Sequence, residues 1–336
     1  RMTSEEVASH YNAVKQPGIE ERKKSRIYHL RNVNNWMKSM LINEALDILR
    51  KEGVHNPRVL DIGCGKGGDL RKWSVARAKS VVMADIADVS IEQAKGRYEE
   101  MKGRDSRIFQ AHFIAADCCA VDIAPLIPDS FLPFDLVSSQ FSLHYSFADY
   151  ASVRRYVRNA VQKIRPGGLF IGTLPDSNRI MWSVRQSSDS EWSNAVCRIK
   201  YSDPASIDNP PLFGATFDFS LDEQVNCPEF LAYFPLLERL LNEEGMELVF
   251  ERNFPEASKE YLKGHEGKKL LERMSGLKVI TKKEEGLDAE EYGHVMKERE
   301  GGEQGDEGTL SRSEWQAFSM YILFAFRKKK PESTDN

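Results

Sequence analysis

Four short apolar runs, each followed by a polar residue, dominate the first half of the chain. They cover residues 59–60, 80–84, 112–116 and 134–139, with helical stretches between them. Strands of a parallel sheet are buried on both faces and therefore appear as continuous apolar runs joined by crossover helices. The pattern predicts an α/β fold built on a doubly wound, mostly parallel sheet.

A polar side chain follows each of these runs. Asp61 follows the first, Asp85 the second, Asp117 the third and Gln140 the fourth. Open parallel sheets bind ligands outside the carboxyl ends of their strands. We therefore expect these four side chains to converge on one binding site.

The segment after Asp61 is rich in glycine, which lets the chain turn tightly and lets a ligand touch the backbone. The glycines are Gly63, Gly65, Gly67 and Gly68. Their spacing also fits the dinucleotide fingerprint, a match that is not specific by itself. The acids on either side, Asp61 and Asp69, would repel a diphosphate, so the loop favours a nucleoside ligand other than NAD.

Two asparagines beside a tryptophan form a second informative signal. Asn34, Asn35 and Trp36 precede the amphipathic residues 40–49, and residues 3–6 resemble a capping box that opens an earlier helix. Asparagine side chains need hydrogen-bond partners when they are buried. Asn35 therefore either caps the helix that follows or contacts a ligand.

Composition argues against several classes of protein. The chain has 336 residues, of which 41% are hydrophobic and 29% charged, and its formal net charge is −4. This charge does not suit a broad basic surface that coats nucleic acid, although Lys66, Arg71 and Lys72 form a local basic cluster after the glycine loop. No apolar run approaches the roughly 20 residues of a membrane span, and the cysteines form no CxxC pair, so we expect neither a membrane nor a metal as partner.

The ordered motifs resemble the class I S-adenosylmethionine-dependent methyltransferases. That class carries a glycine loop after the first strand, a ribose-binding acid after the second and an acid beside the adenine after the third, which match here as Gly63, Asp85 and Asp117. Longer blocks, among them RNVNNWMKS, VLDIGCGKGGDLRKW, QFSLHYSF and CPEFLAYFPLLERL, are similar to the cellular mRNA cap guanine-N7 methyltransferases, and the similarity runs from about residue 7 to about residue 327.

This resemblance implies two sets of binding residues and several partners. The donor S-adenosylmethionine, which leaves as S-adenosylhomocysteine, is expected at Lys38, Asp61, Gly63, Gly65, Asp85, Asp117, Gln140 and Tyr145. The cap is expected at Asn34, Asn35, Lys66, Lys72, Arg97, His144, Glu229 and Tyr321. The resemblance also implies 5′-capped RNA as a partner and a nuclear location, with a small activating subunit and the transcription and capping machinery as further candidates.

The implied reaction converts GpppN to m7GpppN by methyl transfer to N7 of the terminal guanosine. Guanine N7 carries a free lone pair at neutral pH, so in-line displacement needs proximity and orientation but no general base. The residues expected to position the substrates are His144, Tyr145, Glu229 and Tyr321. A carboxylate such as Glu229 suits the ring N–H and amine of guanine, and after Pro228 it suits a helix N-terminus equally well.

The whole chain, residues 1–336, is expected to form one catalytic domain. An N-terminal helical segment for cap and donor is expected at residues 3–50, and a cofactor-binding core at 57–175. Substrate-side insertions with closing strands follow at 176–327 and include a flexible loop at 281–308, and a tail covers 328–336. The sheet is expected to have seven strands, completed by residues 164–173 and by antiparallel strands at 246–254 and 319–326. Residues 213–229 predict a cap-side insertion, and residues 230–243 an amphipathic helix.

A small-molecule S-adenosylmethionine-dependent methyltransferase is the alternative function. It would share the glycine loop and the strand-end acids. It gives no reason, however, for the asparagine–tryptophan segment or for basic residues beside the loop.

Overall fold

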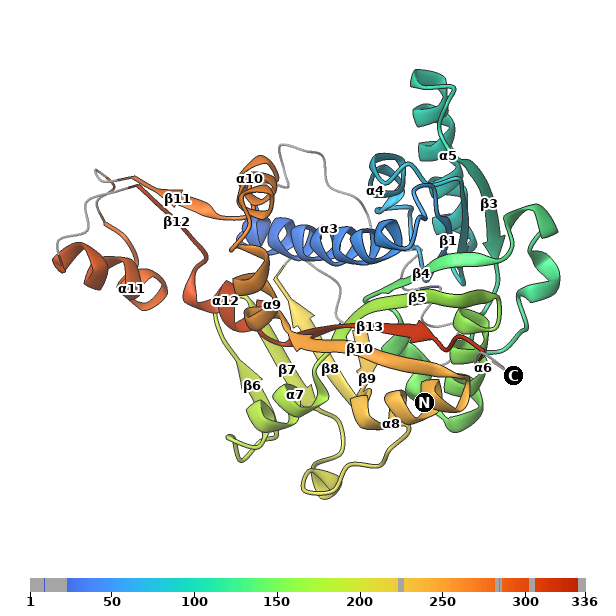
Figure 1. Ribbon diagram of the computed structural model, residues 1–336. Helices are drawn as coiled ribbons and strands as arrows, with labels where there is room; N and C mark the ends of the chain where they lie inside the picture. The colour runs from blue at the N-terminus through green and yellow to red at the C-terminus, as the bar shows by residue number, and fades with distance from the viewer. Residues whose placement is uncertain are drawn as a thin grey trace.

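A seven-stranded sheet forms the centre of the molecule, with the order β10-β13-β5-β4-β1-β2-β3 (Figure 1). The computed structural model describes residue 9 and residues 23–222, 227–281, 284, 286–301 and 306–331, so the predicted capping box at residues 3–6 lies outside the described residues. The strands of the sheet are β1 Arg58–Ile62, β2 Ser80–Asp85, β3 Gln110–Ala115, β4 Phe134–Gln140, β5 Ile164–Pro175, β10 Met246–Asn253 and β13 Tyr321–Lys328.

The strand directions confirm a doubly wound, mostly parallel sheet. β1 pairs in parallel with β2 and β4, β2 with β3, and β4 with β5. β13 lies between β5 and β10 and runs antiparallel to both. The prediction that β10 and β13 complete the sheet through antiparallel pairing is confirmed, and β10 points the same way as the parallel strands because β13 lies between them. An apolar run does not record strand direction, which is set by how the chain returns to the sheet.

Helices pack against both faces of the sheet. On one face, helices α3 Tyr28–Lys51, α4 Leu70–Val75 and α9 Phe254–Tyr261 contribute to one buried cluster, and on the other α6 Tyr150–Val161 and α8 Phe234–Glu243 contribute to a second. Figure 1 shows α3 above the sheet and α8 below it. Successive strand residues alternate between the clusters, so every position must be apolar. Among the described residues, no helix is both long enough and apolar enough to span a membrane.

The helix that carries Asn34 and Asn35 begins earlier than predicted. α3 starts at Tyr28, so both asparagines lie inside it, and the interpretation of Asn35 as a helix cap is wrong. The early start has a tertiary cause. The carboxylate of Glu314 accepts a hydrogen bond from the backbone N–H of Leu30 (3.1 Å), one of the N–H groups that a helix start leaves without an intrahelical partner.

A second, four-stranded antiparallel sheet extends the molecule below the first. Its strands are β6 Glu191–Ser193, β7 Cys197–Tyr201, β8 Thr216–Leu221 and β9 Cys227–Phe230, in that order across the sheet. The insertion is thus larger than the predicted residues 213–229. The helix predicted from residue 230 begins at Phe234, because Phe230 still pairs with Thr216 in β9.

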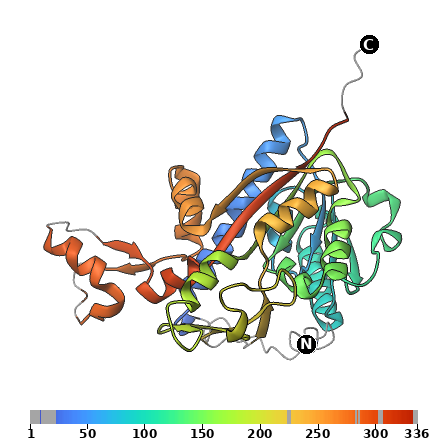
Figure 2. The same cartoon turned by 90° about the horizontal axis from the view of Figure 1, so that it is seen from below.

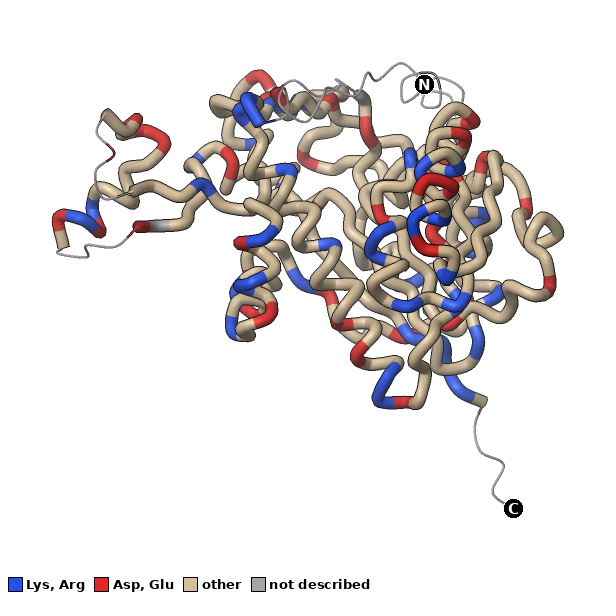
Figure 3. Tube along the Cα trace, turned by 90° about the horizontal axis from the view of Figure 1, so that it is seen from above, with Lys and Arg blue, Asp and Glu red and all other residues tan. Residues whose placement is uncertain are grey.

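An arm projects from the side of the molecule (Figures 1, 2 and 3). It contains α11 Ala289–Glu300 and the paired strands β11 Lys278–Ile280 and β12 Glu307–Thr309, and it lies beside α10 His265–Arg273 and α12 Arg312–Phe318. Residues 289–300 of the predicted flexible loop at 281–308 form the helix α11. This helix has tertiary anchors that composition does not reveal: Val295 is buried, and Glu291 accepts hydrogen bonds from the backbone and hydroxyl of Ser313.

Candidate active site

The glycine loop after β1 adopts a backbone conformation that requires glycine. Gly63, Gly65 and Gly67 all have positive φ, at 72°, 52° and 74°. A Cβ atom on Gly63 would also overlap the Ser142 hydroxyl. The backbone conformation disfavours a side chain at all three positions, and the Ser142 contact excludes one at Gly63 as well, so a ligand can approach the backbone of the loop closely.

Two acids at or just after strand ends accept hydrogen bonds from the loops at the carboxyl edge of the parallel sheet. Asp85 accepts hydrogen bonds from the backbone N–H groups of Gly65 (2.8 Å) and Ala87 (2.9 Å), and burial raises its pKa above the ordinary value. Asp117 accepts from the N–H of Cys119 (2.8 Å). The predicted ribose and adenine acids therefore lie at the carboxyl ends of β2 and β3, where the sequence placed them.

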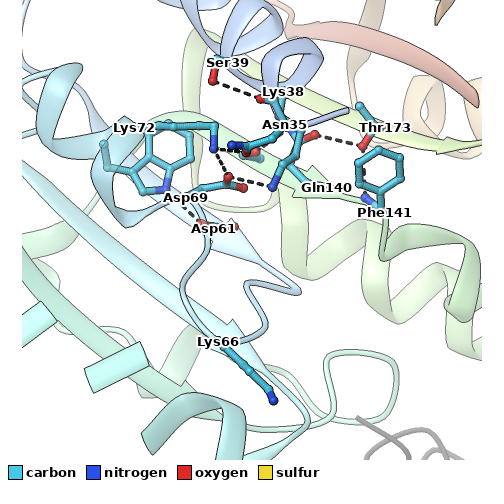
Figure 4. Close-up of polar contacts among 12 residues, drawn as sticks. Asn35, Lys38, Ser39, Asp61, Lys66, Asp69, Lys72, Gln140, Phe141 and Thr173 are labelled. Atoms are coloured by element: carbon cyan, nitrogen blue, oxygen red, sulfur yellow. Dashed lines mark hydrogen bonds and ion pairs between the residues drawn. The ribbon is translucent and has the colours of Figure 1, made fainter. Parts of the chain in front are cut away.

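A buried ionic cluster joins α3 to α4 (Figure 4). Lys38 and Lys72 both donate to the same carboxylate oxygen of Asp69, at 2.8 and 2.7 Å, and Lys72 also donates to the Asn35 amide oxygen at 2.6 Å. Burial would raise the pKa of Asp69, but the two ammonium groups outweigh it and hold the pKa at about 2. Lys38, predicted to contact the donor, and Lys72, predicted to contact the cap, thus share the carboxylate of Asp69.

Asp69 was not among the predicted site residues. The sequence showed it only as an acid unfavourable to a diphosphate. The spacing of Asp69 and Lys72, three residues apart at the start of α4, was an available signal for an ion pair on one helix face. The contact with Lys38 spans 31 positions of the chain and depends on how α3 crosses the sheet.

Asp61 lies beneath this cluster. One of its oxygens accepts a hydrogen bond from the indole N–H of the fully buried Trp73 (2.9 Å). Burial and the charge of Asp69 together raise the pKa of Asp61 to about 7. The group can therefore change charge near neutral pH.

This pKa predicts how stability should change with pH. The folded pKa of about 7 lies above the ordinary 3.8, so the stability contribution is greatest at low pH and is lost as pH rises to about 7. Between pH 5 and 8 the unfolding free energy should fall by on the order of 2–3 kcal/mol through this group. The pKa of Asp69, about 2, lies below this pH range, so Asp69 does not change the pH dependence of the unfolding free energy between pH 5 and 8. Urea unfolding of the wild type and of Asp61→Asn across that range checks the prediction, and an equal pH slope in both proteins would contradict it.

A second group of predicted residues joins the second sheet to the segment that follows β4. Glu229 on β9 lies 3.3 Å from the Tyr145 hydroxyl, which donates to it, and 3.2 Å from Nε2 of His144. Both rings belong to the 3₁₀ segment Leu143–Ala148, and their centroids are 4.3 Å apart. His144 is 2% exposed; its Nδ1 has no hydrogen-bond partner in the described residues, and Nε2 has only the Glu229 carboxylate beside it, without a hydrogen bond between them. Buried polar atoms of this kind are suited to a ligand.

Aromatic rings line the neighbouring end of β13. Tyr321, the first residue of that strand, meets Phe141 edge-on with centroids 5.0 Å apart, and Phe254 packs against both. Phe141 is one of four non-glycine residues with positive φ in the described chain, at 54°. Sequence motifs placed Phe141 only as a neighbour of Gln140. Its unusual backbone is visible only in the structure.

The predicted cap-binding cations do not form one group. Lys72 belongs to the buried ionic cluster, whereas Lys66 lies on the glycine loop and points away from that cluster in Figure 4. Arg97 on α5 Asp88–Arg104 joins Lys66, because its guanidinium donates to the Lys66 carbonyl oxygen (2.9 Å). Asn34 remains beside Asn35 on α3, with a buried amide oxygen that accepts no hydrogen bond from the described residues.

The parallel sheet with β13 inserted, the glycine loop and the acid ending β2 define a class I methyltransferase. The family model for the mRNA (guanine-N(7))-methyltransferase domain matches residues 1–329. The mRNA cap guanine-N(7) methyltransferase of Caenorhabditis elegans is 52% identical over 99% of this chain and 89% of its own length. The chain belongs to the mRNA (guanine-N(7))-methyltransferase family. It is an enzyme that uses S-adenosylmethionine as methyl donor.

More distant relatives carry the same name. The Drosophila melanogaster mRNA cap guanine-N(7) methyltransferase is 39% identical over 96% of this chain and 77% of its own length. The corresponding Schizosaccharomyces pombe protein is 32% identical over 96% of this chain and 82% of its own length. In the described residues, no group of three or more His, Cys, Asp or Glu side chains could hold a metal ion.

Proposed function

We propose that the enzyme transfers the methyl group of S-adenosylmethionine to N7 of the terminal guanosine in GpppN-capped RNA, by in-line displacement without a general base. The observation that carries this proposal is the pairing of His144 and Tyr145 with Glu229. It brings a carboxylate from the second sheet to the edge of the first, 3.3 Å from a tyrosine predicted to contact the donor. A carboxylate can accept from both the ring N–H and the amine of guanine.

The donor is proposed to bind between the glycine loop and the ionic cluster. S-adenosylmethionine supplies the methyl group on a positively charged sulfur. Lys38 suits its carboxylate, Asp61 its ammonium group and Asp85 its ribose hydroxyls, because each offers the complementary charge or acceptor. Gly63 and Gly65 allow its close approach to the backbone, while Asp117 suits the adenine amine. Gln140 and Tyr145 are proposed to border its sulfonium end.

The cap is proposed to bind on the opposite side of the reacting methyl. Glu229 holds the guanine edge, and His144 and Tyr321 set the plane of the base. A ring that gains positive charge on methylation is favoured by a nearby carboxylate and by aromatic faces. Asn34 and Asn35 border the cap, and Lys66, Lys72 and Arg97 are proposed to balance the phosphate charges.

The cellular setting follows from the substrate. Capped RNA is the proposed partner and the nucleus the proposed location, because a capping enzyme acts on new transcripts. A small activating subunit and the capping machinery are the proposed protein partners.

Substrate comparison tests the proposal. Labelled S-adenosylmethionine is incubated with GpppA-capped RNA, with the same RNA carrying a 5′ triphosphate, and with free GTP. We expect rapid labelling of the capped RNA and at least about 100-fold slower labelling of the triphosphate RNA, because only the cap offers the terminal guanine in register. Equal labelling of capped and uncapped RNA would refute the proposal.

A further inference from the structure

Thr173 lies between the two halves of the site without belonging to either predicted set. It is a fully buried residue near the end of β5, and it pairs with Gln140 of β4 on one side and Leu323 of β13 on the other. Its hydroxyl therefore sits where donor-side and cap-side elements adjoin (Figure 4).

The Thr173 hydroxyl fixes the orientation of the Gln140 amide. The hydroxyl accepts a hydrogen bond from the backbone N–H of Phe141 (3.1 Å) and donates to Oε1 of Gln140 (2.9 Å). The opposite side of the amide is also engaged, because Nε2 donates to the Ser138 hydroxyl (3.0 Å). Hydroxyl groups therefore hold both ends of the amide, which fixes its plane and the rotamer of the Gln140 side chain.

Thr173 also holds the strained turn that follows. Phe141 has a φ of 54°, in the left-handed region that is unfavourable for a residue with a side chain. Its backbone N–H is held twice by Thr173, at 3.0 Å from the carbonyl oxygen and 3.1 Å from the hydroxyl. This turn places the Phe141 ring edge-on against the ring of Tyr321.

We infer that Thr173 is a positioning residue for methyl transfer, which orients the Gln140 amide toward the donor and seats Phe141 against Tyr321 of the cap side. The inference rests on the proposed function, since it takes Gln140 as a donor contact and Tyr321 as a cap contact. Thr173 itself touches neither substrate in this assignment. It acts through Gln140 and Phe141.

Thr173→Val tests the inference, because valine keeps the shape and removes the hydroxyl. We expect about tenfold weaker binding of S-adenosylhomocysteine by calorimetry and a raised KM for the donor, since the amide loses the bond that sets its orientation. Thr173→Ser restores the hydroxyl and should bind within about twofold of wild type. Ser183→Ala is the matched control: it removes a buried hydroxyl bonded to the Arg179 carbonyl on α7 Ser177–Val184 and should leave donor binding unchanged.

A double-mutant cycle separates positioning from general stability. In a Gln140→Ala background, Thr173→Val should change donor affinity by less than about twofold, because the amide that it orients is gone. An equal loss in both backgrounds, an unchanged affinity in Thr173→Val, or a serine variant as weak as valine would each overturn the inference. Calorimetry of donor binding needs no RNA, so its result is independent of the substrate comparison. A wild-type enzyme that binds the donor but does not methylate capped RNA would refute the proposed function and not the role of Thr173 in donor binding.

Discussion

Glu229→Gln should slow methyl transfer to capped RNA by about 100-fold or more, while the affinity for S-adenosylhomocysteine stays within about twofold. Glutamine keeps the size of the side chain but replaces one acceptor oxygen with an N–H₂ group. That group would face the N–H donors of guanine, and two donors cannot satisfy each other in a site closed by the buried His144. Donor binding should survive, because the residues assigned to it other than Tyr145 do not contact Glu229 in the assignment, and the oxygen that glutamine retains can still accept the hydrogen bond from the Tyr145 hydroxyl.

The control for this variant is Glu191→Gln. Glu191 lies on β6 of the same second sheet and pairs on the surface with Arg198, at 2.7 Å. The same chemical change there should leave methyl transfer within about twofold of wild type, because exposed ion pairs contribute little. A Glu229→Gln enzyme that methylates capped RNA at the wild-type rate would remove Glu229 from the proposed cap site.

Asp69→Ala should produce the largest loss of stability of any single change near the site. It leaves the ammonium groups of Lys38 and Lys72, whose side chains are 17% and 12% exposed, close together without their shared anion. Removing one member of a buried ionic group costs about 3–5 kcal/mol. The affinity for S-adenosylhomocysteine should fall by at least about tenfold as well, because Lys38 loses the contact that fixes its position.

Urea unfolding and calorimetry measure these two effects, with Asp47→Ala as the control. Asp47 makes an ion pair with Arg50 on the exposed face of α3, at 3.0 Å, and its loss should cost no more than about 1 kcal/mol. The pH dependence gives a second check. The pKa of Asp69 is lowered to about 2, so its contribution is present above about pH 4 and is lost as pH falls toward 2. Unfolding curves of Asp69→Ala that match those of Asp47→Ala would contradict this account of the cluster.

The central fold could be predicted because its strands are buried on both faces. Residues such as Val81 and Val82 face different hydrophobic clusters, so the whole of β2 had to be apolar and was recognisable in the sequence. The positions of Asp61, Asp85 and Asp117 followed from the rule that parallel strands present their carboxyl ends at one edge. These features are local in sequence or follow from topology alone.

What could not be predicted depends on contacts between distant segments. Glu314 sets the start of α3 from 284 positions away, which is why Asn35 was misplaced as a cap. Lys38 and Lys72 belong to one cluster only because α3 and α4 pack on the same face of the sheet. The division of the predicted cations between that cluster and the loop at Lys66 arises in the same way. The positive charge that Lys66, Lys72 and Arg97 share does not indicate which of these side chains is buried in the ionic cluster.

The most direct test of the central claim locates the transferred methyl group. GpppA-capped RNA is labelled with S-adenosyl-[methyl-³H]methionine and digested to nucleosides, in parallel with RNA whose terminal guanine is 7-deazaguanine. We expect all of the label as 7-methylguanosine and none on the 7-deaza cap, because that base lacks the accepting nitrogen. Label on a ribose hydroxyl or on an internal base, or equal labelling of the 7-deaza cap, would contradict the assignment of guanine N7 as the acceptor.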